Sequence, residues 1–181
     1  RYNALLNDEQ RAFCRSIYQF KQGDIHGIEF FKTCMNALQL KKRPYHIMFM
    51  PRSNWIKYGQ RFKRLDWYIG KHRQDLTSGL YDVDICDARE SLHEAKGGEK
   101  RILERNYLIT GNIKGKEIII IDDVLTTGQS VADYKEEIER CGGKVVAAIF
   151  YGKTFSMPSM LLVQIHVWGN HIAHIIERMT K

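Results

Sequence analysis

The chain has 181 residues, of which 44% are hydrophobic, so it is long enough for a single domain with a sizeable core. No apolar run approaches about 18 residues and the N-terminal residues lack the apolar core of a signal peptide, so we expect neither a membrane-spanning helix nor a leader. The net charge of +7 indicates an anionic partner, either a nucleic acid or a small polyanionic substrate, or else a merely basic surface.

The cysteine pattern bears on the compartment in which the protein works. The four cysteines, at positions 14, 34, 86 and 141, form no CxxC pair. Isolated cysteines of this kind are typical of reduced thiols rather than of a disulfide framework or a zinc site. We therefore expect a cytoplasmic protein.

Residues 1–40 predict two helices. Asn7 or Asp8 can cap the first of them, which covers residues 9–22. Apolar residues spaced three and four apart fit one face of the second helix, over residues 25–40.

A core strand and a candidate anion-binding loop follow these helices. The apolar run at residues 45–50 predicts a buried strand, and residues 60–72 predict a helix. A loop that joins a core strand to a helix is a candidate anion site, because a helix N-terminus presents free N–H groups. Arg52, Ser53 and Asn54 lie in this loop, for which a simple surface loop is the alternative.

The middle of the chain predicts a long hairpin. Residues 80–85 alternate apolar and acidic side chains, as expected of an edge strand, and residues 103–110 regain extended character. Between them, residues 86–101 are polar and charged and include a Gly-Gly pair. A mobile loop between two strands is the natural interpretation.

The most informative stretch is residues 116–130. Its four consecutive isoleucines are typical of a buried parallel strand, and they lead directly into Asp122 and Asp123. Adjacent carboxylates at the end of such a strand can accept hydrogen bonds from ribose hydroxyls or hold Mg²⁺. The turn that follows offers backbone N–H groups and hydroxyls to a phosphate at the N-terminus of a helix over residues 130–140. A plain strand and capped helix would explain Ser130 but not the two acids. The residues of the turn are Thr126, Thr127, Gly128, Gln129 and Ser130.

The C-terminal part continues the alternation of strands and helices. Residues 144–151 and 160–168 predict strands, and residues 171–179 predict a last helix. The whole order predicts an α/β fold, a parallel twisted sheet flanked by helices. We expect one domain over residues 1–181, made of a helical segment at 1–40, a core at 41–153 and a C-terminal strand and helix at 154–181.

Residues 118–130 closely resemble the phosphoribosyl pyrophosphate (PRPP) signature of type I phosphoribosyltransferases. That signature has four apolar residues, two acids, two apolar or variable residues, a short Thr/Gly loop and a final Ser or Thr, and every position is matched here. Arg105 and Asn106 further resemble the ComF-type subgroup. The resemblance implies the fold of that family, with N-terminal helices and a variable hood built from the terminal segments.

The resemblance also implies a reaction, in which ribose 5-phosphate passes from PRPP to a nitrogenous base or amine and pyrophosphate leaves. The turn at residues 126–130 then binds the 5-phosphate, and Asp122 and Asp123 hold the ribose hydroxyls and Mg²⁺ and stabilise the charge that develops on the ring. In the loop after the first strand, Arg52, Ser53 and Asn54 correspond by position to the pyrophosphate-binding residues of the family.

Two further sets of contacts are implied by the resemblance. Arg89, His93 and Lys96 lie in the segment that corresponds to a flexible loop closing over the reacting sugar, where they would meet pyrophosphate oxygens. Lys153 and Trp168 are the expected contacts to the acceptor base. An exposed loop position for His93 and a core or interface position for Trp168 are the alternatives.

The sequence leaves the acceptor and the final activity open. Thr126 stands where the hypoxanthine–guanine branch of the family usually has an acid, so orotate-type, ComF-type and other acceptors remain. A catalytically silent PRPP- or nucleotide-binding regulator and a ComF-type DNA-uptake accessory protein are the alternative functions. The basic residues concentrate in three clusters, at residues 41–43, 52–73 and 96–105. A nucleic acid is the less favoured partner, because two of these clusters flank the predicted loops of the site. Homodimers are common in the family, although no residue here demonstrates one.

Overall fold

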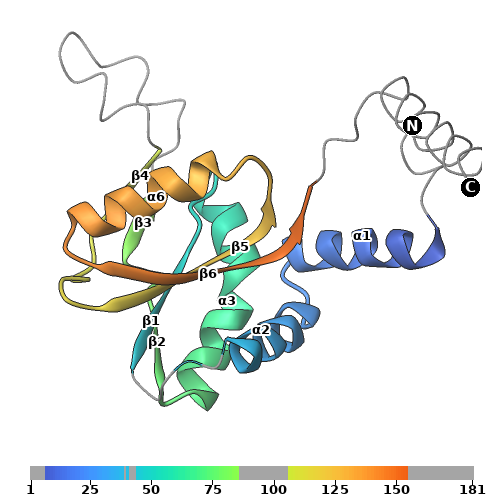
Figure 1. The fold of residues 1–181 in the computed structure, drawn as a ribbon, viewed down its shortest axis with the longest axis horizontal. Helices are drawn as coiled ribbons and strands as arrows, with labels where there is room; N and C mark the ends of the chain where they lie inside the picture. The colour runs from blue at the N-terminus through green and yellow to red at the C-terminus, as the bar shows by residue number, and fades with distance from the viewer. Residues whose placement is uncertain (1–6, 39, 41–43, 86–105, 155–181) are drawn as a thin grey trace, which may run out of the picture.

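A parallel sheet of four strands, in the order β2-β1-β5-β6, forms the centre of the structure (Figure 1). The computed structural model describes residues 7–38, 40, 44–85 and 106–154. The sheet confirms the predicted α/β class. Its strands are β1 (Tyr45–Phe49), β2 (Leu76–Ser78), β5 (Glu117–Leu125) and β6 (Lys144–Lys153).

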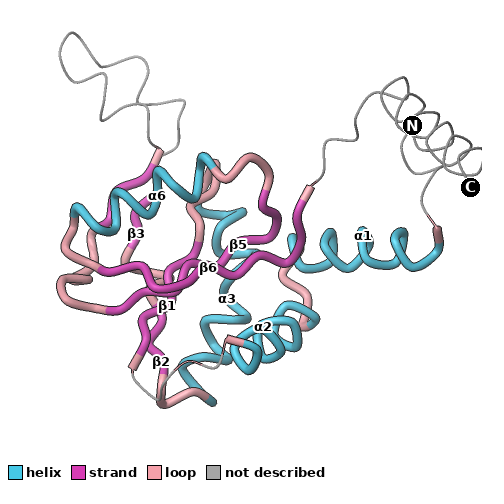
Figure 2. The backbone as a smooth tube through the Cα atoms, in the orientation of Figure 1, coloured by secondary structure: helices cyan, strands magenta, loops and turns pink. Residues whose placement is uncertain are grey.

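Two crossover connections leave the middle of this sheet in opposite directions. From β1 the chain passes through α3 to β2, and from β5 it passes through α6 to β6 on the other side. Because such crossovers are right-handed, α3 and α6 cover opposite faces, and α3 passes behind β6 in Figure 2. The helices are α1 (Asp8–Lys21), α2 (His26–Ala37), α3 (Trp55–His72) and α6 (Gln129–Arg140).

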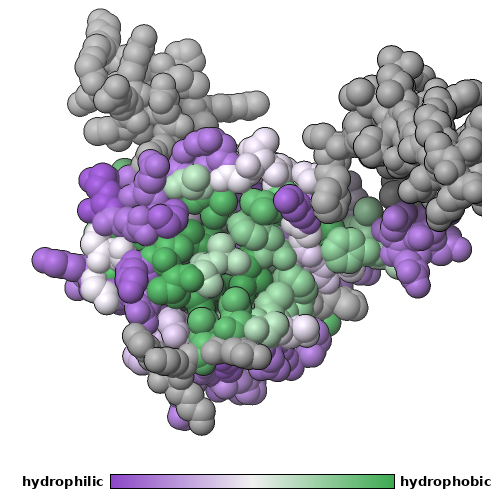
Figure 3. All heavy atoms as spheres, viewed as in Figure 1, coloured by the Kyte–Doolittle hydropathy of each residue, from purple (hydrophilic) through white to green (hydrophobic). Residues whose placement is uncertain are grey.

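The hydrophobic core is built on the isoleucine run of β5. These four side chains, at residues 118–121, are at most 3% exposed. On the α3 side, Phe62 packs against Phe49 with ring centroids 4.8 Å apart and against Phe20 at 6.2 Å. Figure 3 shows apolar side chains gathered over the sheet, with polar side chains around the rim.

The predicted hairpin is present at its base. The strands β3 (Val83–Ile85) and β4 (Tyr107–Ile109) pair antiparallel in a separate two-stranded sheet. The connection between them at residues 86–105 lies outside the described residues, as do the strand and helix predicted after residue 154.

Several element boundaries differ from the sequence predictions. The helix α3 begins at Trp55 instead of residue 60, because the side chain of Asn54 accepts a hydrogen bond from the Lys57 N–H at 2.9 Å and caps it there. The helix α2 ends at Ala37, three residues early. The short strand β2 was not predicted. The capping role of Asn7 on α1 is confirmed by a reciprocal capping box with Gln10.

We predict that Phe62→Ala lowers the free energy of unfolding by about 3–5 kcal/mol, because it removes a fully buried ring from the contact between α3 and the sheet. Urea denaturation followed by circular dichroism measures the change. On the same helix, Ile56 is 78% exposed, so Ile56→Ala should change the free energy by less than about 0.5 kcal/mol. Equal effects of the two substitutions would contradict the assigned packing.

Candidate functional site

The two acids lie where the pairing of β5 with its neighbours becomes one-sided. The ladder with β1 ends at the pair Phe49 and Ile121, whereas the ladder with β6 continues to the pair Leu125 and Lys153. Asp122 and Asp123 therefore belong to the strand and do not follow its end as predicted, but their β1 side is open. This is also the point where the two crossovers diverge, which is where open α/β sheets form a ligand crevice.

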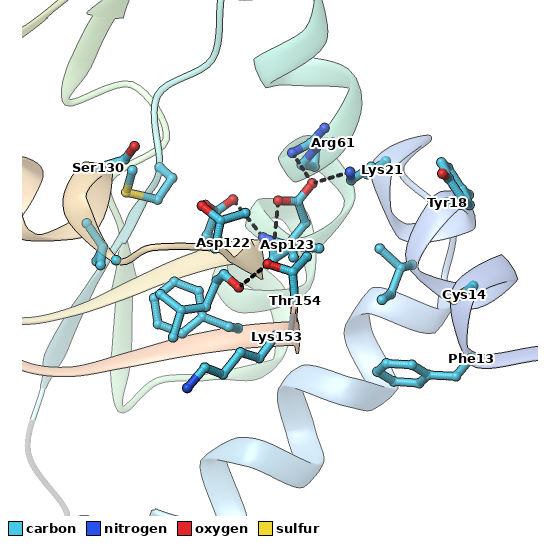
Figure 4. Close-up of a pocket in the computed structure, with 18 of the residues that line it drawn as sticks. Phe13, Cys14, Tyr18, Lys21, Arg61, Asp122, Asp123, Ser130, Lys153 and Thr154 are labelled. Carbon is cyan, nitrogen blue, oxygen red and sulfur yellow. Dashed lines mark hydrogen bonds and ion pairs between the residues drawn. The ribbon is translucent and has the colours of Figure 1, made fainter. Parts of the chain in front are cut away.

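Three cations from three different elements neutralise this acid pair. Arg52, in the loop after β1, donates from Nη2 to Oδ1 of Asp122 and, at 2.8 Å, to Oδ1 of Asp123. Arg61 of α3 donates from Nη1 to Oδ2 of Asp123 at 2.5 Å, and Nζ of Lys21, the last residue of α1, lies 3.5 Å from the same oxygen. Figure 4 shows Arg61 and Lys21 converging on Asp123.

Burial and these cations act in opposite directions on the two carboxyl groups. Burial raises the pKa of Asp122 to about 7, against the influence of Arg52. Burial also acts to raise the pKa of Asp123, but Arg52 and Arg61 together outweigh it and hold that pKa below its ordinary value. The two groups interact directly, so the pair shares the cost of holding negative charge.

The predicted phosphate-binding turn is open to solvent. Gly128 is the N-cap of α6 with a φ of +85°, a conformation that favours glycine, and it has no side chain to cap the helix. The N–H of Gln129, the first residue of α6, donates to Oγ1 of Thr127 at 3.4 Å. Thr126, Gly128 and Ser130 line the same cavity as the acid pair. Free N–H groups in the first turn of α6 therefore face a space in which an anion can be bound.

The helix α1 forms the opposite wall of this cavity, whose volume is about 1480 Å³. Phe13, Cys14 and Tyr18 face it from α1, and Lys153 lies at the end of β6 (Figure 4). The N-terminal helical segment therefore reaches the site. The hood built from both terminal segments stays a prediction, because residues 155–181 lie outside the described residues.

The remaining predicted residues fall into two groups. Ser53 is exposed and does not line the cavity, and the side chain of Asn54 is committed to capping α3. Thr127 and Gln129 also lie off the cavity wall, and the Gln129 side chain donates to Asp133 at 2.7 Å. Outside the described residues are Arg89, His93, Lys96, Arg105 and Trp168.

Sequence reasoning missed Arg61 and Lys21, the two cations that hold Asp123. The position of Arg61, two turns into the helix that follows the predicted anion loop, is a weak indication that it belongs to the site. A second contact also went unforeseen, because Nδ2 of Asn106 donates to the backbone carbonyl of Arg52 at 2.7 Å and so fixes that loop. Asn106 was singled out only as a subgroup marker.

The donor set fits Mg²⁺ in the limited way that this ion requires. Mg²⁺ binds through one or two carboxylates, water and substrate phosphates, and the carboxyl groups of Asp122 and Asp123 both line the cavity. The same part of the chain contains no group of three or more His, Cys, Asp or Glu side chains suited to a metal. It also contains no helix long and apolar enough to cross a membrane.

Comparison with known proteins finds a family that is similar to the segment around the acid pair. Residues 74–154 match the phosphoribosyl transferase domain. The chain is 42% identical over 57 residues to an orotate phosphoribosyltransferase of Sulfolobus acidocaldarius, which covers 31% of this chain and 26% of that protein. It is 30% identical over 98 residues to the transcriptional regulator GfcR of Methanocella arvoryzae, which covers 54% and 38%.

These curated relatives are thus matched over about a quarter to two fifths of their length. Among solved structures, a hypoxanthine-guanine phosphoribosyltransferase of Bacillus anthracis aligns with a TM-score of 0.37 and 12% identity, over 81% of this chain and 74% of that one. A hypoxanthine phosphoribosyltransferase of Staphylococcus aureus aligns with a TM-score of 0.33 and 15% identity, over 81% and 70%.

We predict that Asp122→Asn changes how stability depends on pH. A carboxyl group whose pKa is higher in the folded than in the unfolded protein costs stability as pH rises from about 4 to about 7. The variant lacks this cost, so its free energy of unfolding relative to the wild type should increase by about 2–3 kcal/mol between pH 5 and pH 8. Urea denaturation at both pH values measures it.

This window lies above the titration of Asp123, whose pKa is lowered, so that group does not obscure the comparison. As a control, Glu136→Gln alters an exposed acid of α6 and should run parallel to the wild type. A difference between Asp122→Asn and wild type that is constant across the window would contradict the raised pKa.

Proposed function

We propose that the chain transfers ribose 5-phosphate from PRPP to a nitrogenous base or amine and releases pyrophosphate, and the match of residues 74–154 to the phosphoribosyl transferase domain supports this proposal. The observation that carries the proposal is the joint placement of the acid pair and the open N-terminus of α6 in one cavity. A sugar phosphate needs both at once, because its hydroxyls require acceptors and its phosphate requires donors.

In this function, hydrogen-bond donors bind the phosphate and carboxylates bind the ribose. The N–H groups and hydroxyls of residues 126–130 bind the 5-phosphate, and Asp122 and Asp123 accept hydrogen bonds from the ribose hydroxyls. The carboxylates lie beside the ring, where they stabilise the positive charge that develops as the bond to pyrophosphate breaks. A Mg²⁺ ion bound with PRPP would supply neutralisation of the leaving group, with Asp122 and Asp123 as its protein-side ligands.

The cations on the acid pair provide the complementary half. Three positive charges surround two carboxyl groups, so the cluster retains positive charge that a pyrophosphate group can use. Arg52 is the best placed for this role, since Asn106 holds its backbone and its Nε is buried without a hydrogen-bond partner among the described residues.

The contacts to the acceptor and the closing loop remain part of the proposal. Lys153 lies at the cavity and suits a carbonyl of the acceptor. We assign acceptor stacking to Trp168 and contacts to the departing pyrophosphate to Arg89, His93 and Lys96. The wall formed by α1 then contributes to the choice of acceptor. An acceptor of the ComF-type subgroup remains one candidate.

A second function is favoured by the likeness to GfcR, which is named a transcriptional regulator. A regulator that senses PRPP would keep the acid pair and the phosphate-binding turn but would transfer nothing. This alternative predicts binding of PRPP without turnover, so one pair of measurements separates it from the enzyme.

The experiment is calorimetry with PRPP and Mg²⁺, followed by an assay for pyrophosphate release with a panel of purine and pyrimidine bases. We expect binding of PRPP and turnover with at least one base. Binding without turnover would favour the regulator. Absence of binding at millimolar PRPP would overturn both functions.

We predict that Asp123→Asn weakens PRPP binding about 10- to 100-fold, because it removes a charged acceptor for a ribose hydroxyl. Calorimetry measures the affinity, and circular dichroism tests the fold. The variant should remain folded, though less stable, since Arg61 and Lys21 lose their partner. With Glu136→Gln as the matched control, unchanged affinity in Asp123→Asn would remove the acid from the site, and loss of the folded state would make its role structural.

A further inference from the structure

The helix α3 holds most of the excess positive charge of the protein. Residues 55–73, which are α3 and its C-cap, contain six Lys or Arg residues and a single acid, Asp66, so their net charge is +5 out of +7 for the chain. The six basic residues are Lys57, Arg61, Lys63, Arg64, Lys71 and Arg73.

Only two of these cations are paired within the described residues. Arg61 contacts Asp123 in the candidate site, and Arg73 pairs with Asp75 at 2.7 Å. The other four side chains are exposed and form no ion pair in the described part of the chain. They are Lys57, Lys63, Arg64 and Lys71.

These four cations share the outer face of the helix. Residues 57, 60, 64, 67 and 71 follow one another at spacings of three and four, which places Lys57, Arg64 and Lys71 on one side of the helix. Lys63 is three residues from position 60 and four from position 67, so it lies at the edge of the same side. The buried residues of α3, at positions 58, 62, 65 and 69, have the same spacing on the opposite side. The outer face therefore presents a basic stripe that, from residue 57 to residue 71, is about 21 Å long.

A large aromatic ring lies in the middle of this stripe. Trp67 is 55% exposed, and the Nζ of Lys71 lies 4.9 Å from the centroid of its ring. An exposed indole between cations is a surface on which an unpaired base can stack while phosphates on either side are neutralised.

We propose that the outer face of α3 binds single-stranded nucleic acid, with Lys57, Lys63, Arg64 and Lys71 on the phosphates and Trp67 stacked on a base. None of these residues lines the cavity of the candidate site, so this surface is separate from the proposed transferase activity. A lipid surface fits less well, because the large apolar residues of this face are Ile56 and Trp67 alone, whereas a membrane-bound helix presents a broad apolar face.

The test is fluorescence anisotropy of a labelled oligothymidylate strand titrated with the full chain over a range of salt concentrations. Each phosphate contact to a single strand contributes about −0.7 to the slope of log K against log salt, so four contacts give a slope of about −3. We expect that slope, and weaker binding to a duplex of the same length, whose bases are not free to stack on Trp67.

Matched variants locate the binding on α3. The double substitution Lys63→Gln with Arg64→Gln should reduce the magnitude of the slope by about 1.4. Lys114→Gln with Lys135→Gln removes two exposed positive charges elsewhere and should leave it unchanged. Trp67→Ala should weaken binding about tenfold without changing the slope, because it removes stacking but no charge.

The proposal would be overturned if the strand did not bind at low salt, or if the control pair reduced the slope as much as the pair on α3. It would also be overturned if duplex DNA or anionic vesicles bound as tightly as the strand and if Trp67→Ala did not change that binding. Displacement of the strand by millimolar PRPP at constant ionic strength would also overturn it, because the strand would then occupy the phosphate-binding turn. Circular dichroism of each variant confirms that it is folded.

Discussion

The constraint on which this end of the structure depends is the burial of two adjacent carboxylates. Asp122 and Asp123 extend a strand whose other side chains after Glu117 are apolar, and both are at most 9% exposed. A buried charge is tolerated only when partners replace the water that it loses. Those partners are Arg52, Arg61 and Lys21. Because all three contact the same two acids, the loop after β1, the helix α3 and the end of α1 are held next to one another.

The same interaction makes the site able to respond to a ligand. A network of cations around buried acids is not a strong source of stability, because desolvation offsets most of the attraction between the charges. A polyanion can therefore draw the cations away at modest cost, and hydroxyl donors can then take their place on the carboxylates. The N-terminus of α6 needs no such exchange, because it lines the cavity and no cation occupies it within the described residues.

Features formed by neighbouring residues in the sequence could be predicted, whereas contacts between distant residues could not. The strand, the acids and the turn at residues 118–130 are contiguous, so their pattern alone indicated a phosphate site and the class of the fold. Arg61 could not be assigned in this way, because it is 62 positions from Asp123 and only the packing of α3 against the sheet brings them together. Asn54 was predicted as an anion-binding residue, and only the structure shows that its side chain accepts a hydrogen bond from the Lys57 N–H and caps α3. The strand β2 has three residues, too few for any periodicity, and exists because β1 pairs with it.

The cations of the basic segment at residues 52–73 fall into two groups in the structure. From the sequence, this segment was assigned to a substrate cleft. The described structure directs Arg52 and Arg61 to the acid pair, but four other cations of α3 are exposed and do not line the cavity. A ligand in the cavity therefore contacts Arg52 and Arg61 and does not contact these four side chains. One helix thus presents positive charge to two separate places, and each place needs its own anion.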